Sequence, residues 1–204
     1  MKSIKITLAI SLLALSLNSH GQSKELQNAF SQSYTYETAQ NYEGAIASMN
    51  SVYNAASYEI NLRLGWLNYL AGKYKESVTF YEKAATIMPA STEPLWAMIT
   101  PLTKQENWKD IEKAYLAILK TDSKNASANY NLGYIYYYRK DYVNAKKYFD
   151  VCLNQAPFNY NYMLMSAWAN YFLGNKNEAV ILFNKTLLYS PNDKSALEGL
   201  GLIK

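Results

Sequence analysis

The chain has 204 residues, which is enough for one domain of ordinary size with a sizeable hydrophobic core. Its 20 basic and 16 acidic residues give a net charge of +4, and the lysines are scattered singly or in pairs. A nucleic-acid-binding surface normally needs a strong basic excess gathered on one face. The charge balance therefore argues against a nucleic-acid partner and favours a solvated charged surface.

Residues 1–21 are predicted to be a secretory signal peptide. Two lysines within the first five residues precede an apolar run from Ile6 to Leu17, and a small-residue exit ends at Gly21. The run is too short for an easy membrane span, which is typical of a cleaved signal rather than of an anchor. We therefore expect an exported protein, periplasmic or secreted, with a signal peptide that resembles those of Bacteroidetes. An uncleaved N-terminal anchor or a buried helix is the alternative.

Cleavage after Gly21 would leave a chain with no histidine and with a single cysteine, Cys152. This composition excludes a His-dependent triad, a Cys–His pair, a His-ligated metal site and a multi-cysteine zinc site. The sequence also contains no glycine-rich phosphate loop and no paired-carboxylate motif. We therefore expect a protein that is not an enzyme, with no catalytic residue, no metal and no cofactor.

Glycines and prolines recur along the chain at a fixed period. Pro157 and Pro191 lie 34 residues apart, which is one period, and Gly65 and Gly133 lie 68 residues apart, which is two periods. Self-similarity at a period of about 20–50 residues is the signature of a repeat architecture. After the signal segment, the frame predicts a repeat domain over 22–204, with repeats near 26–57, 58–91, 92–125, 126–159 and 160–193 and a capping helix over 194–204.

Each repeat is expected to contain two helices, for example over 58–71 and 75–88, because an inner turn and a terminal proline or serine interrupt the apolar pattern. The first repeat is two residues shorter than the others. All its equivalent positions keep the same offset from those of the second repeat, which places the deletion in the linker after Ser57. In the third repeat Pro101 falls inside the first helix, where a kink is expected. Cys152 occupies a repeat position at which the other repeats carry small or medium-sized residues, and it is expected to be buried.

The fourth repeat carries the most informative motif. The run from Asn131 to Tyr136, with Gly133 inside it, is followed by Ala145, Phe149 and Pro157. This pattern resembles the tetratricopeptide repeat family, and the resemblance extends over about residues 26–204. It implies an all-α fold: an α-solenoid of about five helix–turn–helix repeats, closed by the C-terminal capping helix.

In that family the first helix of each repeat lines a concave surface on which ligands bind, so the resemblance indicates which residues to inspect. A stripe beside the glycine column, turned by about 100° around the helix, is rich in aromatic residues. The candidate groove residues are Tyr34, Trp66, Tyr69, Trp96, Tyr130, Tyr134, Tyr137, Trp168 and Tyr171.

Two interpretations of this stripe stay open. Tyr and Trp offer large rigid area with a polar handle, which suits an extended peptide or a sugar chain. The same rings could instead fill a tight superhelix. The leading hypothesis is a non-enzymatic exported scaffold or adaptor that binds a protein or peptide partner in the groove, and the alternative is an envelope glycan- or peptidoglycan-binding protein. Few cationic residues lie near this face, so a clamp for C-terminal carboxylates is not expected.

Overall fold

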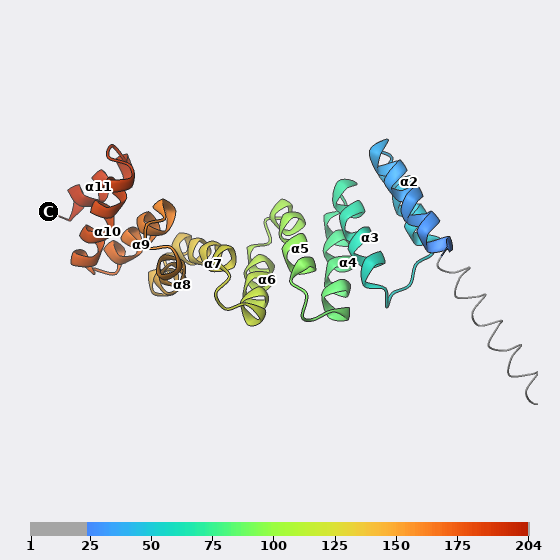
Figure 1. Ribbon diagram of the computed structural model, residues 1–204, viewed down its shortest axis with the longest axis horizontal. Helices are drawn as coiled ribbons and strands as arrows, with labels where there is room; N and C mark the ends of the chain where they lie inside the picture. The colour runs from blue at the N-terminus through green and yellow to red at the C-terminus, as the bar shows by residue number, and fades with distance from the viewer. Residues whose placement is uncertain (1–23, 204) are drawn as a thin grey trace, which may run out of the picture. The chain divides into compact units, whose positions relative to one another are not determined.

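The computed structural model describes residues 24–203, and the predicted signal segment lies outside them. Every regular element in this range is a helix. The chain divides into two compact units, one up to Gln105 and one from Glu106 onward. The division falls in the predicted inner turn of the third repeat. Figure 1 shows the order of the helices along the chain.

The first unit consists of helices that pack consecutively. They are a helix over residues 24–38, α2 (Tyr42–Asn50), α3 (Tyr58–Leu70), α4 (Tyr74–Ile87) and α5 (Glu93–Lys104). α3 packs on α4, and α4 packs on α5. The expected helices of the second repeat are confirmed, because both observed helices end within one residue of the predicted bounds.

The second unit continues the same pattern of paired helices. It contains α6 (Trp108–Thr121), α7 (Ala126–Tyr138), α8 (Tyr142–Gln155), α9 (Tyr160–Phe172), α10 (Lys176–Tyr189) and α11 (Lys194–Leu202). α7 packs on α8 and α9 on α10, while α11 contacts both α9 and α10. The all-α architecture of repeated helix pairs expected from the sequence is confirmed.

Short polar side chains start these helices. A cap side chain accepts a hydrogen bond from a main-chain N–H in the first turn, which satisfies one of the donors left free at a helix start. The caps that do so are Asn41, Ser57, Asn107, Asn125, Asp141, Asn159 and Asp193. Because such residues recur at most repeat boundaries and inner turns, the sequence specifies where the helices begin.

The second helix of the first repeat, α2, ends early. It stops at Asn50, and residues 51–57 are non-helical before α3 begins at Tyr58. Here Ser51 donates to the carbonyl of Ser48, and the side chain of Asn54 accepts from the N–H of Ala56. Such local hydrogen bonds compete with helix continuation. The shortening of the helix therefore lies before Ser57, and α3 follows Ser57 directly.

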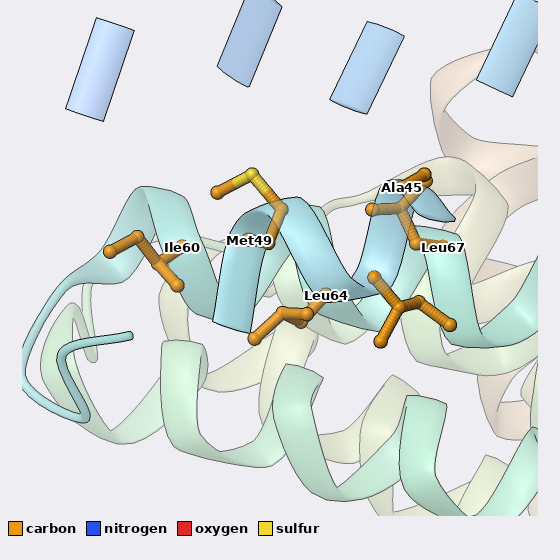
Figure 2. Packing of buried hydrophobic residues seen from close by; sticks show 6 residues of the cluster. Ala45, Met49, Ile60, Leu64 and Leu67 are labelled. Carbon is orange, nitrogen blue, oxygen red and sulfur yellow. The ribbon is translucent and has the colours of Figure 1, made fainter. Parts of the chain in front are cut away.

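The core is built from one face of each helix. In the first unit, Ala45 and Met49 of α2 lie against Ile60, Leu64 and Leu67 of α3, and all five are buried (Figure 2). The corresponding residues of the second unit form similar clusters around Phe149 and Phe183. These side chains occupy the periodic apolar positions of the repeat, so the pattern that predicted the helices also forms the core.

Three glycines let an aromatic ring approach the helix backbone. A Cβ on Gly65, Gly133 or Gly199 would lie closer than 3.0 Å to the ring of Tyr81, Phe149 or Phe183, respectively. In the terminal helix α11, Gly199 lies against Phe183 as Met165 lies against Phe149 one repeat earlier, whereas Gly201, which the repeat frame aligned with the other glycines, has no atom within 4 Å of its Cβ position. α11 begins 34 residues after α9, so the capping helix keeps the spacing of the repeat frame.

Two residues that the sequence singled out, Pro101 and Cys152, are both buried. Helix α5 runs through Pro101, which is buried close to the C-terminal end of the helix. Cys152 is fully buried, as expected, and burial raises the pKa of its thiol to about 11. A thiol in this state is a core residue rather than a reactive group. Within residues 24–203, no helix combines the length and the apolar character that crossing a membrane requires.

Candidate binding surface

The nine predicted groove residues all lie on the first helices of the repeats, and we call them the aromatic stripe. The first unit carries Tyr34 on the helix over 24–38, Trp66 and Tyr69 on α3, and Trp96 on α5. The second unit carries Tyr130, Tyr134 and Tyr137 on α7, and Trp168 and Tyr171 on α9. Tyr34 is 54% exposed and Trp66 is 42% exposed, while the other seven are half-buried.

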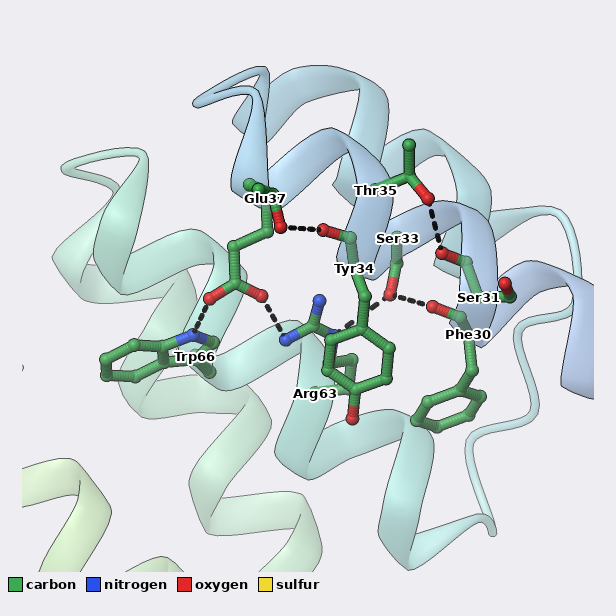
Figure 3. Close-up of polar contacts among 9 residues, drawn as sticks. Phe30, Ser31, Ser33, Tyr34, Thr35, Glu37, Arg63 and Trp66 are labelled. Carbon is green, nitrogen blue, oxygen red and sulfur yellow. Dashed lines mark hydrogen bonds and ion pairs between the residues drawn. The ribbon is translucent and has the colours of Figure 1, made fainter.

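The exposed rings of the first unit are held by a buried ion pair (Figure 3). Arg63 of α3 is only 7% exposed, and its Nη1 lies 2.5 Å from Oε2 of Glu37. The other carboxylate oxygen of Glu37 accepts a hydrogen bond from Nε1 of Trp66 at 2.7 Å. The Arg63 guanidinium also lies 3.9 Å from the centre of the Tyr34 ring, a cation–π distance. Glu37 and Arg63 therefore fix both exposed rings in place.

One side-chain nitrogen of Arg63 has no hydrogen-bond partner among the described residues. Its Nε donates to the hydroxyl of Ser33 at 3.0 Å, and that hydroxyl donates to the carbonyl of Phe30 at 2.8 Å. Nη2 of Arg63, by contrast, is buried without a hydrogen-bond partner among the described residues. Leaving a buried charged donor unpaired is costly, so this atom marks a place where an acceptor would be stabilised.

A cavity of about 630 Å³ opens beside this network, and we call it the first-unit cavity. Aromatic rings and two carboxylates dominate its lining. The residues that the argument below uses are Tyr34, Tyr58, Glu59, Arg63, Trp66 and Glu93. Tyr58 donates to Glu93 at 2.8 Å, and burial together with that carboxylate raises the pKa of Tyr58, so the hydroxyl keeps its proton at neutral pH. The cavity is therefore aromatic, open and acidic.

The stripe of the second unit is packed more closely. The rings of Tyr130 and Tyr134 meet edge to face at 4.8 Å, and the Tyr130 hydroxyl donates to that of Tyr134. Trp168 contacts the buried Phe183 at 5.1 Å, and its Nε1 donates to Ser195. Burial raises the pKa of Tyr137 to about 12. These contacts hold the rings within the helix layer, as the packing interpretation expects.

A second cavity, of about 450 Å³, lies between α6 and α7, and we call it the second-unit cavity. Its rings come from Trp108, Tyr115, Tyr134 and Tyr138, with Asn131 beside them. Trp108 is 53% exposed and Tyr138 is 76% exposed. The first-helix stripe could not identify Trp108, because this residue opens the second helix of its repeat. Tyr138 belongs to a run of three tyrosines, the only signal that could have drawn attention to it.

Charge near the second-unit cavity is neutralised. Arg139 pairs with Glu112, which also accepts a hydrogen bond from Tyr136 at 2.6 Å. Burial pushes the pKa of Glu112 upward, but the hydrogen bonds from Tyr136 and Arg139 outweigh it and leave the pKa below its usual range. Among residues 24–203, no group of three or more His, Cys, Asp or Glu side chains is placed to hold a metal ion.

Two segments match family models described as tetratricopeptide repeat, residues 58–91 and residues 127–159. No curated protein matches the chain. A tetratricopeptide repeat protein from Parabacteroides merdae is similar in structure, with a TM-score of 0.67 at 20% identity over 88% of this chain and 72% of that one.

Two further solved structures are similar at lower identity. The MamA protein gives a TM-score of 0.65 at 18% identity, over 81% of this chain and 91% of its own. YrrB, described as a tetratricopeptide repeat protein with an unusual peptide-binding site, gives 0.66 at 15% identity, over 91% and 97%. At such identities the likeness shows a shared fold.

Proposed function

Because the chain carries tetratricopeptide repeats and has the solenoid fold of tetratricopeptide repeat proteins, we propose that it is a non-enzymatic scaffold that binds a partner protein. Repeats of this kind serve protein–protein interaction and are generally non-catalytic. The finer proposal is that a segment of the partner lies on the part of the aromatic stripe that the first unit carries and enters the first-unit cavity.

One observation carries this proposal: Tyr34 and Trp66 are exposed at a cavity and yet held rigidly by Glu37 and Arg63. Binding surfaces gain affinity when aromatic anchors lose little freedom on association. Rings that served only to fill the fold would be buried, as Phe149 is. The similarity to YrrB, whose description names a peptide-binding site, supports a peptide-like ligand.

The test is the loss of partner recovery when the anchors are removed. We expect the double change Tyr34→Ala and Trp66→Ala to weaken binding of a partner identified by crosslinking in the host, at a cost of about 2 kcal/mol or more per anchor. The measurement is the dissociation constant of the purified pair. Both side chains lie outside the buried core, so the helical content should persist, which circular dichroism checks.

A matched control uses aromatic residues of similar exposure in the same unit that lie off the stripe. Tyr36 is 40% exposed and Tyr53 is 39% exposed. The double change Tyr36→Ala and Tyr53→Ala should leave the dissociation constant unchanged. If both double variants bind the partner as the parent does, the stripe of the first unit is not the binding surface.

Glycan binding is the second candidate, and the second-unit cavity favours it. The exposed rings of Trp108 and Tyr138 flank Tyr134 and the amide of Asn131, so that flat apolar faces stand beside a hydrogen-bonding group. Sugars present an apolar face and a polar rim that suit such a site. Intrinsic tryptophan fluorescence should then change on titration with peptidoglycan or polysaccharide fragments, and this change should disappear with Trp108→Ala.

Export is part of the same proposal, and it rests on the basic, apolar and small-residue pattern of residues 1–21. The protein isolated from its host should begin at Gln22 and occur in the periplasmic or secreted fraction. N-terminal sequencing after fractionation measures both. A chain that keeps Met1 and stays in the cytosolic fraction would contradict export.

A further inference from the structure

The charge of the first-unit cavity is not balanced. The guanidinium of Arg63 is matched by Glu37 at 2.5 Å. The other two charged lining residues are Glu59 and Glu93, which accept hydrogen bonds from Ser57 and Tyr58. Neither of these two carboxylates forms an ion pair within the described range 24–203. The cavity lining and its network thus contain three carboxylates and one cation.

The aromatic lining of the cavity suits a positive charge as well as an apolar chain. The faces of Trp and Tyr rings attract ammonium and guanidinium groups, more strongly when water is partly excluded. The molecule itself shows this contact, because the Arg63 guanidinium lies 3.9 Å from the centre of the Tyr34 ring. Trp66 and Tyr58 add further rings in the same cavity. Unpaired carboxylates beside such rings attract a cation and also accept its hydrogen bonds.

Arg63 supplies an independent indication of the ligand. Its unpartnered Nη2 is buried and belongs to a residue that lines the cavity, so an acceptor on the ligand would satisfy it. A peptide offers such an acceptor in each main-chain carbonyl oxygen. A free amine or a metal ion offers none. Because Glu37 already neutralises Arg63, this donor does not prevent a cationic side chain from entering nearby.

We propose that the first-unit cavity binds a lysine or arginine side chain of the partner segment, with a main-chain carbonyl oxygen of that segment accepting from Nη2 of Arg63. The cationic group lies against the rings of Trp66 and Tyr58 and is neutralised by Glu59 and Glu93. This inference rests on the proposed peptide-binding function and specifies its ligand: a basic segment rather than an acidic or purely apolar one.

The test is a titration of the whole chain with four acetylated, amidated pentapeptides that are alanine except at the central position. That position holds lysine, arginine, norleucine or glutamate. The reporter is the indole N–H resonance of Trp66, which donates to Glu37 at the cavity and is assigned with Trp66→Phe. The lysine and arginine peptides should bind at least about fivefold more tightly than the norleucine peptide. Added salt should reduce that difference, since the carboxylates are exposed.

Variants separate charge from shape. The pair Glu59→Gln and Glu93→Gln should remove the fivefold preference and leave the norleucine peptide unaffected. The matched control is Glu76→Gln with Glu82→Gln, two exposed carboxylates of α4 outside the cavity lining, which changes the net charge equally. This control should keep the preference.

Each outcome decides between the two proposals. Equal binding of the lysine and norleucine peptides overturns the basic-segment inference and leaves the peptide-binding function standing. Tighter binding of the glutamate peptide overturns the inference as well and assigns the cavity to acidic segments. If none of the four peptides shifts the Trp66 resonance, both the inference and peptide binding at this cavity fail.

Discussion

Replacing Phe149 with alanine is expected to destabilise the protein by about 3–5 kcal/mol, the largest effect of any single change considered. Phe149 is fully buried on α8, and its ring lies over Gly133, where no Cβ intervenes. The rings of Tyr130 and Tyr134 each lie 5.9 Å from it. Truncation would leave a cavity among these three contacts. Urea unfolding followed by circular dichroism measures the loss.

Gly133, which lies against the Phe149 ring, allows a sharper test of this contact. Gly133→Ala should cost about 1–3 kcal/mol in the parent, because its new methyl group would overlap the ring. In the Phe149→Ala background the same methyl group would enter the vacated space, and the cost should largely vanish. Leu188→Ala, at a side chain 75% exposed, should change the free energy of unfolding by less than about 0.5 kcal/mol. Additive costs of the first two changes would show that the contact is not formed.

Replacing Arg63 with methionine is expected to cost about 3 kcal/mol of stability, although the residue lines the proposed binding cavity. The change removes the partner of Glu37, whose side chain is only 24% exposed, and leaves its carboxylate with the Trp66 indole as its remaining donor. It also removes the donor to Ser33 and the cation over Tyr34. Breaking one side of a buried pair is costly because a desolvated charge remains. Chemical unfolding again provides the measurement.

Two further variants test whether the unpaired Glu37 carboxylate causes the loss of stability. Adding Glu37→Gln to Arg63→Met should restore much of the loss, because no buried charge is then left unpaired. Lys73→Met breaks an ion pair with Glu43 whose side chains are 39% and 69% exposed, and it should cost less than about 1 kcal/mol. If the double variant is no more stable than Arg63→Met alone, the ion pair is not the cause.

Much of the fold followed from periodic residues. The repeat frame predicted both helices of the second repeat within one residue, because caps such as Ser57 and terminators such as Pro89 act locally. The frame did not predict the early end of α2 at Asn50, because this end depends on local hydrogen bonds of Ser51 and Asn54 that the repeat positions do not reveal.

The sequence predicted which helices carry the aromatic stripe, but not how the charged residues beside it pair. Helical geometry placed Tyr34 and Trp66 on one stripe, and both are exposed there. Arg63 is one of the few cationic residues near this face, yet it is buried under Tyr34 and paired with Glu37, which sequence position alone does not indicate. Its partner lies on the first helix of the preceding repeat, and the choice among several possible partners depends on side-chain rotamers. Sequence spacing carries no information about rotamers.

The contacts between glycines and rings also constrain how this chain can evolve. Gly65 faces Tyr81 and Gly133 faces Phe149, in each case across the two consecutive helices of one repeat. In these two repeats a Cβ would overlap the ring as it lies, whereas the fifth repeat places Ala167 and Phe183 at the equivalent positions with both fully buried. Descendants of this sequence can therefore replace such a glycine only if the ring opposite it moves to a position like that of Phe183.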